Sequence, residues 1–485
     1  MSPDARRFAA GASWLYGYRW IERLLDFLSI VVLARILAPS DFGLVAIAAS
    51  FVTIIEGLSA FDVNKVLIRS REVSRPLHES AWTLSVMRGL STALIMLAIA
   101  PFIEDVRIGA VLAVLALSPI INGLANPWFV LFERNLDYSK LAFQTLSAKI
   151  VSFAVTVSLA IITRSYWSLV VGLLSGSLVT TILSYLLNPF RPRFSMARFP
   201  EIFGFSGWLW LTSLVTTLAM ETDKIIVGRL LGVGDAGFYF MTQRVGVLPT
   251  RELVSPLQRM LLPSFSDMIR DSTRLRRVVC ESINVLGSLS ISAGLGFAMV
   301  ADDFVPLVLG DRWRPIVPLL QILVPYLGLR ATLSTTLPCV MALGRTRLLF
   351  WVSFVYAFVH LPAFIAGTVL FGLMGAIISI VAAGVLYSYL NAWMLKVTLG
   401  ISLRDILKQI GRPLAASLIM VVALIAFEAT QIFDTSSQSR AWLSLILEVT
   451  VGCVAFGASL YSIWRLEGRP AGIERRLSQV LQRGD

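Results

Sequence analysis

Apolar segments of similar length alternate with short polar ones along the whole chain. Most of them hold about 20 residues, enough for an α-helix to cross a hydrocarbon core of about 30 Å. No polar stretch between them is long enough to form a soluble domain. The pattern predicts an all-α integral membrane protein with about fourteen transmembrane helices. The predicted spans lie near residues 12–34, 43–61, 80–102, 108–131, 142–163, 167–188, 203–222, 237–262, 279–301, 314–342, 348–370, 372–395, 413–433 and 441–464.

Basic residues are distributed unequally between the two sides of these spans. About 26 Lys and Arg residues fall on the side of the N-terminus, and about 8 fall on the other side. Cytoplasmic loops of membrane proteins carry the excess of basic residues. We therefore expect a multi-pass protein with an even number of spans and with both termini in the cytoplasm.

The composition agrees with this fold class. The chain has 485 residues, of which 56% are hydrophobic and 15% are charged, and its mean hydropathy is +0.76. Soluble domains carry about 25% charged residues. The net charge of +12 does not indicate nucleic-acid binding, because the basic residues alternate with apolar segments instead of forming one patch. Cys280, Cys339 and Cys453 all lie in apolar segments, so we expect neither disulfides nor a metal site.

One short pattern occurs twice. Residues 30–43 and 225–237 each end an apolar run with Arg, an aliphatic residue, Leu, three further residues, Asp, one residue and Gly. The copies close spans one and seven, so an even number of spans separates them and they share one orientation. Such duplication is typical of transporters built from two structural repeats. We therefore expect an N-terminal six-helix lobe (1–195), a C-terminal six-helix lobe (196–400), helices thirteen and fourteen (401–464) and a basic cytoplasmic tail (465–485).

The first span carries four charges: Arg19, Glu22, Arg23 and Asp26. Their spacing of i, i+3, i+4 and i+7 places them on one helical face. Each charge inside a membrane costs roughly 2.5 to 3.5 kcal/mol on insertion scales, and such residues face a bundle interior or a wet cavity. The face is therefore a candidate binding surface between the lobes. The alternative is self-neutralisation, with Arg19 paired to Glu22 and Arg23 to Asp26.

The repeat gives the second lobe a polar but uncharged counterpart of this face. The equivalent positions in span seven are Ser213, Thr216, Thr217 and Met220. Hydroxyl groups in membrane helices can also simply bond to their own backbone, and this alternative stays open.

Other ionisable residues at the predicted membrane depth extend the candidate site. Cations outnumber carboxylates among the deeper ones, which favours an anionic ligand, and guanidinium groups bind phosphate oxygens in pairs. We therefore assign substrate binding to arginines and ion coupling to carboxylates. The candidates are Arg19, Arg23, Arg88 and Arg251 for the substrate, Glu22, Asp26 and Glu56 for a coupling ion, and Ser213, Thr216 and Thr217 as the polar stripe of the second lobe.

The sequence contains no catalytic or nucleotide-binding signature. It has no Walker loop, no glycine fingerprint of a dinucleotide fold and no paired histidine ligands. We therefore expect no enzymatic activity, no cofactor and no metal. An ion gradient, the membrane potential or the gradient of the substrate itself would supply the energy for transport.

Several short motifs together resemble one known family. They are Trp14, ARILAPSDFG at 34–43, FER at 132–134, LPSFS at 262–266 and LGDRW at 309–313. The set is similar to the polysaccharide transport family, with its Wzx-type flippases, of the multidrug/oligosaccharidyl-lipid/polysaccharide exporter superfamily. The resemblance covers most of the chain.

The resemblance implies two six-helix lobes around a central cavity and alternating access. It also implies that the substrate is an undecaprenyl-diphosphate-linked oligosaccharide unit, exported across the bacterial inner membrane for exopolysaccharide or lipopolysaccharide biosynthesis. Membrane lipids and the polysaccharide polymerase machinery are the partners that this role implies. Related lipid II flippases use cavity arginines, for which Arg19, Arg23 and Arg251 occupy plausible equivalents.

Three alternatives remain at this point. A multidrug antiporter of the same superfamily would favour a cavity dominated by carboxylates, against which the arginine content argues. A membrane glycosyltransferase or polymerase would need a large extramembrane loop or an acidic catalytic cluster, and the loops here are short. A scaffold without transport activity would not require the charges of the first span.

Overall fold

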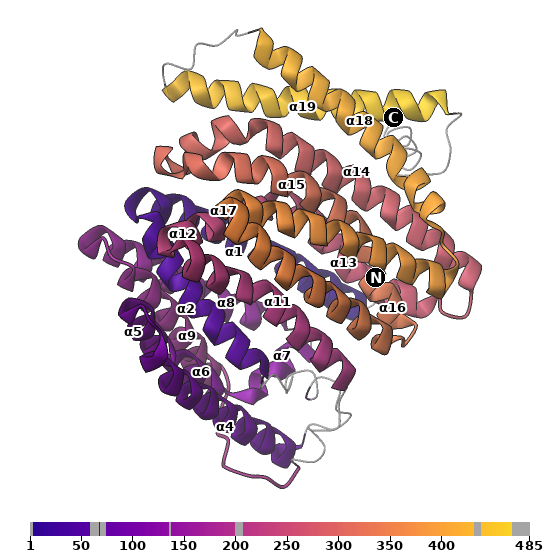
Figure 1. Ribbon diagram of the computed structural model, residues 1–485. Helices are drawn as coiled ribbons and strands as arrows, with labels where there is room; N and C mark the ends of the chain where they lie inside the picture. The colour runs from indigo at the N-terminus through magenta and orange to yellow at the C-terminus, as the bar shows by residue number, and fades with distance from the viewer. Residues whose placement is uncertain are drawn as a thin grey trace. The chain divides into compact units, whose positions relative to one another are not determined.

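The computed structural model describes residues 3–58, 67, 74–134, 137–198, 207–430 and 438–467. These residues form helices, turns and short irregular segments without any β-strand, so the predicted all-α fold class is confirmed. Contacts divide the chain into two compact parts, Met1–Gly237 and Phe238–Asp485. We call them unit 1 and unit 2 and describe each by itself (Figure 1).

Unit 1 is built from long helices joined by short connections. Its helices are α1 (Pro3–Ile36), α2 (Pro39–Leu58), α4 (Arg75–Ile99), α5 (Val106–Leu115), α6 (Leu117–Gly123), α7 (Val130–Arg134), α8 (Tyr138–Thr163), α9 (Trp167–Leu186) and α11 (Gly207–Leu231), with the 3-10 turns η1 (Ala100–Phe102) and η2 (Pro127–Phe129). α12 (Val233–Gly246) begins here and continues into unit 2. Within the unit, α1 packs on α8, α8 on α9, α2 on α5 and α11, and α4 on α6.

Unit 2 has the same character. It contains α13 (Leu248–Asp267), α14 (Ser272–Phe304), the π-helical turn η3 (Val305–Leu309), the 3-10 segments η4 (Asp311–Ile316) and η5 (Leu333–Thr335), α15 (Val317–Thr332), α16 (Thr336–Ala342), α17 (Thr346–Leu399), α18 (Leu403–Ala429) and α19 (Gln438–Leu466). α14 packs on α15 and α18, α15 packs on α17, and α18 packs on α19, the last two helices of the chain in Figure 1. One apolar core cluster forms where α13, α14, α16, α17 and α18 meet.

The number of membrane spans agrees with the prediction only in part. Ten of the described helices are long and apolar enough to cross a membrane. One of them, α17, consists of two helices that meet at Gly372, where φ is 62°, and these match predicted spans eleven and twelve. α1, α11 and the α12–α13 pair lie where spans one, seven and eight were predicted. The multi-pass membrane fold is confirmed, whereas the number fourteen stays a prediction.

Proline-rich spans are interrupted, as the sequence predicts. In span eight, α12 ends at Gly246 and α13 begins at Leu248, so that Pro249 lies in the first turn of a new helix, where its missing N–H is not needed. In span ten, η5 separates α15 from α16. Pro338 has no N–H to donate to the carbonyl of Ser334, which a continuous α-helix would require.

The compact units do not coincide with the predicted lobes. α11 opens the predicted second lobe, yet it packs on α2 and belongs to unit 1. The boundary at 195/196 describes the sequence repeat and stays a prediction. The predicted helices thirteen and fourteen, α18 and α19, pack in unit 2. The predicted tail beyond Glu467 and the side chain of Trp14 lie outside the described residues.

The two copies of the repeated pattern contact each other in unit 1. Gly43 of α2 lies against the backbone carbonyl of Val233, and Gly237 of α12 lies against the backbone carbonyl of Pro39. Pro39 and Val233 occupy equivalent positions in the two copies, so the contact is reciprocal. A Cβ at either glycine would overlap the opposite carbonyl oxygen. Glycine therefore permits the close backbone approach that holds helices together in a membrane.

A second reciprocal crossing occurs once in each unit. α4 and α6 cross at Gly89 and Gly123, and each glycine lies against the carbonyl of the residue four positions before the other. α14 and α15 cross in the same way at Gly294 and Gly328. Both glycines of the second pair follow those of the first by the same offset. The internal repeat thus extends to spans three and four and to spans nine and ten, beyond the pattern visible in the sequence.

Charged residues of the repeated pattern have local structural roles. The carboxylate of Asp41 accepts the backbone N–H three residues earlier at 2.9 Å and so stabilises the start of α2. Arg229 forms an ion pair with Glu104, in the short connection before α5. In the same connection, the hydrogen bond from the Arg107 guanidinium holds the pKa of Asp105 below its usual range.

We expect Gly237→Ala to lower the thermal unfolding midpoint of the detergent-solubilised protein, measured by tryptophan fluorescence. The added Cβ must push α12 away from α2, and overpacking of this kind costs about 1–3 kcal/mol. The matched control is Gly234→Ala, one turn away, where a Cβ meets no atom within 4 Å. Alanine should leave the midpoint unchanged or raise it there, because its helix propensity exceeds that of glycine. Equal midpoints for the two variants would contradict the close crossing.

Candidate functional site

The charged residues of α1 lie on one face, as their spacing predicts. Arg19, Glu22, Arg23 and Asp26 are all half-buried within unit 1. Apolar side chains take the exposed positions between them, among which Trp20 is 62% exposed. In a membrane the exposed apolar side meets lipid, and the charges point toward protein or a wet cavity. α1 thus has an apolar face for lipid and a charged face for the protein interior.

Asp26 forms an ion pair with another helix. Its Oδ1 lies 2.7 Å from Nζ of Lys149 on α8, and both side chains are about one-third exposed. The pair joins α1 to α8, two helices that pack along their length. Lys149 was not among the candidate site residues. The sequence shows Lys149 as an isolated cation within a long apolar span. It does not show that Asp26 is the partner of this cation.

Arg19 retains a buried polar atom without a partner. Its Nε is inaccessible to solvent and forms no hydrogen bond with the described residues. Its guanidinium lies 5.5 Å from the ring centre of Tyr18. Among the described residues no ion pair joins Arg19 to Glu22, so this half of the self-neutralisation alternative is wrong. The guanidinium of Arg23 lies 5.7 Å from the ring centre of Trp20.

Glu56 and Arg88 form a second polar locus in unit 1. They come from α2 and α4, and both side chains are half-buried. The guanidinium of Arg88 lies within electrostatic reach of the Glu56 carboxylate. The structure therefore brings together one predicted substrate-binding cation and one predicted ion-coupling carboxylate.

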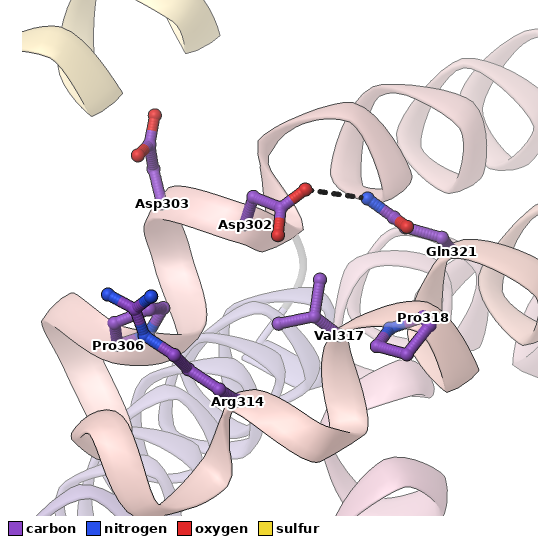
Figure 2. Close-up of a pocket in the computed structure, with 7 residues that line it drawn as sticks. All are labelled: Asp302, Asp303, Pro306, Arg314, Val317, Pro318 and Gln321. Carbon is purple, nitrogen blue, oxygen red and sulfur yellow. Dashed lines mark hydrogen bonds between the residues drawn. The ribbon is translucent and has the colours of Figure 1, made fainter.

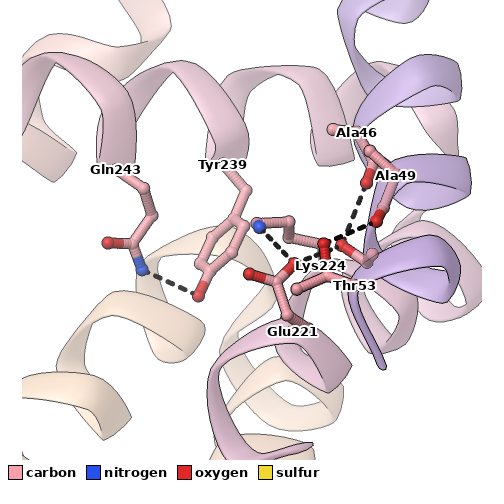
Figure 3. A network of polar contacts seen from close by, with 8 residues as sticks. Ala46, Ala49, Thr53, Glu221, Lys224, Tyr239 and Gln243 are labelled. Carbon is pink, nitrogen blue, oxygen red and sulfur yellow. Dashed lines mark hydrogen bonds and ion pairs between the residues drawn. The ribbon is translucent and has the colours of Figure 1, made fainter. Parts of the chain in front are cut away.

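A network between α2 and α11 was not predicted as a site (Figure 3). Ser50 donates to Oε2 of Glu221 at 2.9 Å, and Nζ of Lys224 lies 2.6 Å from the same oxygen. The same hydroxyl proton is shared with the carbonyl of Ala46 on its own helix. The negative charge of Glu221 is therefore matched by a cation one helical turn away, and the serine links the pair to α2.

The predicted polar stripe of the second lobe is only partly available for a ligand. The hydroxyl of Thr216 donates to the carbonyl oxygens of Thr212 and Ser213, at 2.8 and 3.0 Å. Thr217 directs its methyl group toward Gly57 of α2. Ser213 is exposed. Backbone bonding thus accounts for Thr216, the alternative that the sequence left open.

Unit 2 holds Arg251 and a pocket that the sequence did not indicate. Arg251 lies exposed on α13. The pocket has a volume of about 440 Å³ (Figure 2). It is lined by Asp302, Asp303, Pro306, Arg314, Val317, Pro318 and Gln321. Gln321 donates to Asp302 at 3.0 Å. Over the described residues, no group of three His, Cys, Asp or Glu side chains could hold a metal ion.

Comparison with known proteins identifies the relatives of the chain. Residues 32–318 match the family model described as polysaccharide biosynthesis protein. The chain is 27% identical to the lipopolysaccharide biosynthesis protein WzxC of Escherichia coli (strain K12), over 84% of its length and 85% of the relative. It is 24% identical to the succinoglycan biosynthesis transport protein ExoT of Rhizobium meliloti (strain 1021), over 69% of each chain.

The fold also matches a solved structure. The lipid II flippase MurJ, in an inward closed conformation, aligns with a TM-score of 0.72 and 14% identity, over 92% of this chain and 98% of that chain. At this identity the likeness describes the fold alone. The resemblance predicted from the short motifs is confirmed by the family match and by this fold.

We expect a double-mutant cycle on Asp26 and Lys149 to detect their ion pair. Asp26→Lys and Lys149→Asp should each lower the unfolding midpoint, since each places two like charges together. The double reversal should recover stability, with a coupling of about 1 kcal/mol for a partly exposed pair. The control cycle uses Asp311 and Arg314, an exposed pair 3.0 Å apart, where we expect a smaller coupling. Coupling no larger than that of the control would count against the α1–α8 pair.

Proposed function

The chain belongs to the polysaccharide biosynthesis protein family, and from this premise we propose that it exports undecaprenyl-diphosphate-linked oligosaccharide units. The units would cross the bacterial inner membrane for exopolysaccharide or lipopolysaccharide biosynthesis. The names of WzxC and ExoT, which refer to lipopolysaccharide biosynthesis and to succinoglycan transport, support a polysaccharide precursor as the cargo. The MurJ-like fold supports a flippase mechanism with alternating access.

The observation that carries the proposal is the buried Nε of Arg19. Arg19 lies on the charged face of a membrane helix, and its Nε has no hydrogen-bond partner among the described residues. A buried donor without a partner costs about 1–3 kcal/mol, and more when it is charged. A phosphate oxygen from the substrate would supply the missing acceptor. Guanidinium binds phosphate through two parallel hydrogen bonds, which suits a diphosphate.

The neighbouring ion pair between Asp26 and Lys149 would change how strongly the site binds the diphosphate. Lys149 is held by Asp26, seven residues after Arg19 on the same face of α1. When a diphosphate enters, its negative charge competes with Asp26 for the ammonium group. The lipid tail would remain in the bilayer, while Arg19 and Arg23 bind the diphosphate and the sugars cross in water.

Carboxylates are the candidates for ion coupling. Over the described residues, Glu22 has no ion pair on α1, and Glu56 lies within electrostatic reach of Arg88. Protonation of either carboxylate would change the net charge around the bound diphosphate. The proposal has three further parts. Both termini lie in the cytoplasm, Arg251 is a further cation of the cavity, and the polysaccharide polymerase machinery is a partner.

A multidrug antiporter is the second candidate. It would require a carboxylate free to bind a cationic drug. Two of the carboxylates at membrane depth, Asp26 and Glu221, already lie within 3 Å of a lysine. The buried Nε of Arg19, which has no hydrogen-bond partner among the described residues, favours an anionic cargo instead.

We expect a deletion strain to lose extracellular polysaccharide and to accumulate lipid-linked repeat units at the inner leaflet. Both are measured by radiolabelled sugar incorporation and extraction of the lipid fraction. Normal export in a strain that has no second flippase would overturn the proposed function. Loss of the units themselves, instead of their accumulation, would indicate a synthetic enzyme.

We expect Arg19→Gln to reduce export about tenfold or more in the complemented strain, because it removes the bidentate phosphate contact. Arg19→Lys keeps the charge but not the fork, so export should be intermediate. The control is Arg404→Gln, an exposed arginine on the second residue of α18. Membrane levels of each variant are measured by immunoblot. Full export by a stably inserted Arg19→Gln protein would show that this residue does not hold the substrate.

A further inference from the structure

Unit 2 contains an arginine at membrane depth that has no carboxylate partner among the described residues. Arg330 is half-buried on α15, near the middle of the predicted span over residues 314–342. Within the described part of the chain, the neighbours of its guanidinium are tyrosines. An unpaired cation in a membrane interior is costly and usually marks a ligand or ion pathway.

Two tyrosines hold the Arg330 guanidinium from different helices. It lies within electrostatic reach of the hydroxyl of Tyr326, one turn earlier on α15. It also lies 5.6 Å from the ring centre of Tyr387 on α17. Gly384 of α17 makes room for the Tyr326 ring, since a Cβ there would overlap the phenol. The guanidinium is therefore positioned by aromatic groups and a hydroxyl, none of which neutralises its charge.

The next turn adds donors that lack acceptors. The hydroxyl of Ser334, four residues after Arg330, is buried and forms no hydrogen bond with any described residue. The hydroxyls of Thr335 and Thr336 are also buried and form no hydrogen bond within the described part of the chain, and both residues are fully buried. Tyr326 and Arg330 are spaced by four and share one face of α15. Ser334 follows about one turn after Arg330, in η5, and completes a candidate site of three residues. We call it the Arg330 stripe.

A purely structural explanation accounts for part of this arrangement. An arginine can extend along a helix to reach water, and a tyrosine is a favourable neighbour for its charge. That explanation does not account for the buried hydroxyl of Ser334, about one turn away in η5. Buried hydroxyls normally find a partner, because leaving one unsatisfied costs about 1–3 kcal/mol. An oxyanion would satisfy the guanidinium and the hydroxyl together.

We propose that the Arg330 stripe is an oxyanion-binding site of unit 2. Arg330 would bind two oxygens of the anion through its fork, and Ser334 and Tyr326 would donate to the remaining oxygens. The ligand class rests on the proposed function: the anion is a negatively charged group of the transported lipid-linked oligosaccharide. A phosphate of the diphosphate and a carboxylate of an acidic sugar share the required chemistry.

The test uses the full-length protein in lipid nanodiscs and calorimetric titration with two probes, inorganic pyrophosphate and glucuronate. Each probe is titrated into the wild type and into Arg19→Gln, so that binding at α1 does not mask binding at α15. We expect Arg330→Gln to weaken at least one probe about tenfold or more in both backgrounds. Arg330→Lys should give an intermediate affinity, because it keeps the charge without the fork. Arg404→Gln is the matched control and should bind both probes as the wild type does.

Two milder variants test the site in case Arg330→Gln does not fold. Ser334→Ala and Tyr326→Phe each remove one hydroxyl, and the thermal midpoint of every variant is measured beside the titration. Weaker pyrophosphate binding would identify a phosphate site, and weaker glucuronate binding would identify a sugar carboxylate site. Unchanged affinity for both probes in the folded Arg330→Gln protein, or in both hydroxyl variants if it does not fold, would overturn the proposal.

The two proposals can fail separately. Normal export in the deletion strain would remove the proposed function, yet the titration would still report whether the Arg330 stripe binds an oxyanion. Conversely, lost export in the deletion strain with unchanged probe binding in Arg330→Gln would leave the transport role intact and remove the Arg330 stripe from it.

Discussion

The structure depends on helices that approach each other to backbone contact. Lipid tails are as apolar as the helices themselves, so association relies on close packing rather than on a hydrophobic force. Gly43 and Gly237 provide that contact reciprocally. Gly43 lies against the carbonyl of Val233, the first residue of α12, and Gly237 lies against the carbonyl of Pro39, the first residue of α2. The same geometry recurs between α4 and α6 and between α14 and α15. The repeated sequence pattern thus encodes a helix crossing.

This crossing also sets the position of polar groups further along the helices. Gly43, Ile47 and Ser50 are spaced by four and three residues, so they share one face of α2. Ile47 packs on Gly228 of α11, and Ser50 reaches Glu221 one and a half to two turns earlier on the same helix. A shift of α2 along α11 by one residue would break both contacts. Close packing therefore determines which buried charges can be paired.

The sequence predicts those features that depend on local spacing. Helix positions, the proline breaks and the single charged face of α1 follow from periodicity, and the repeated pattern follows from direct comparison of two segments. Tertiary partners do not. Lys149 lies over one hundred residues from Asp26, and Ser50 lies still further from Glu221, so neither pair leaves a signal at helical spacing. The sequence does not show that α11 belongs to unit 1 for the same reason, because this assignment results from packing on α2.

Two kinds of charged residue at membrane depth can be told apart by their partners. Asp26 with Lys149, and Glu221 with Lys224, are carboxylates paired with cations, and each pair costs less than an isolated charge in the membrane would. Arg19 and Arg330 have no carboxylate partner among the described residues, and each has a buried unsatisfied donor in its own side chain or one turn away. A matched pair can be retained for stability alone. An arginine without a carboxylate partner lowers stability in a membrane, and the two proposals assign a negatively charged ligand to offset this cost at Arg19 and at Arg330.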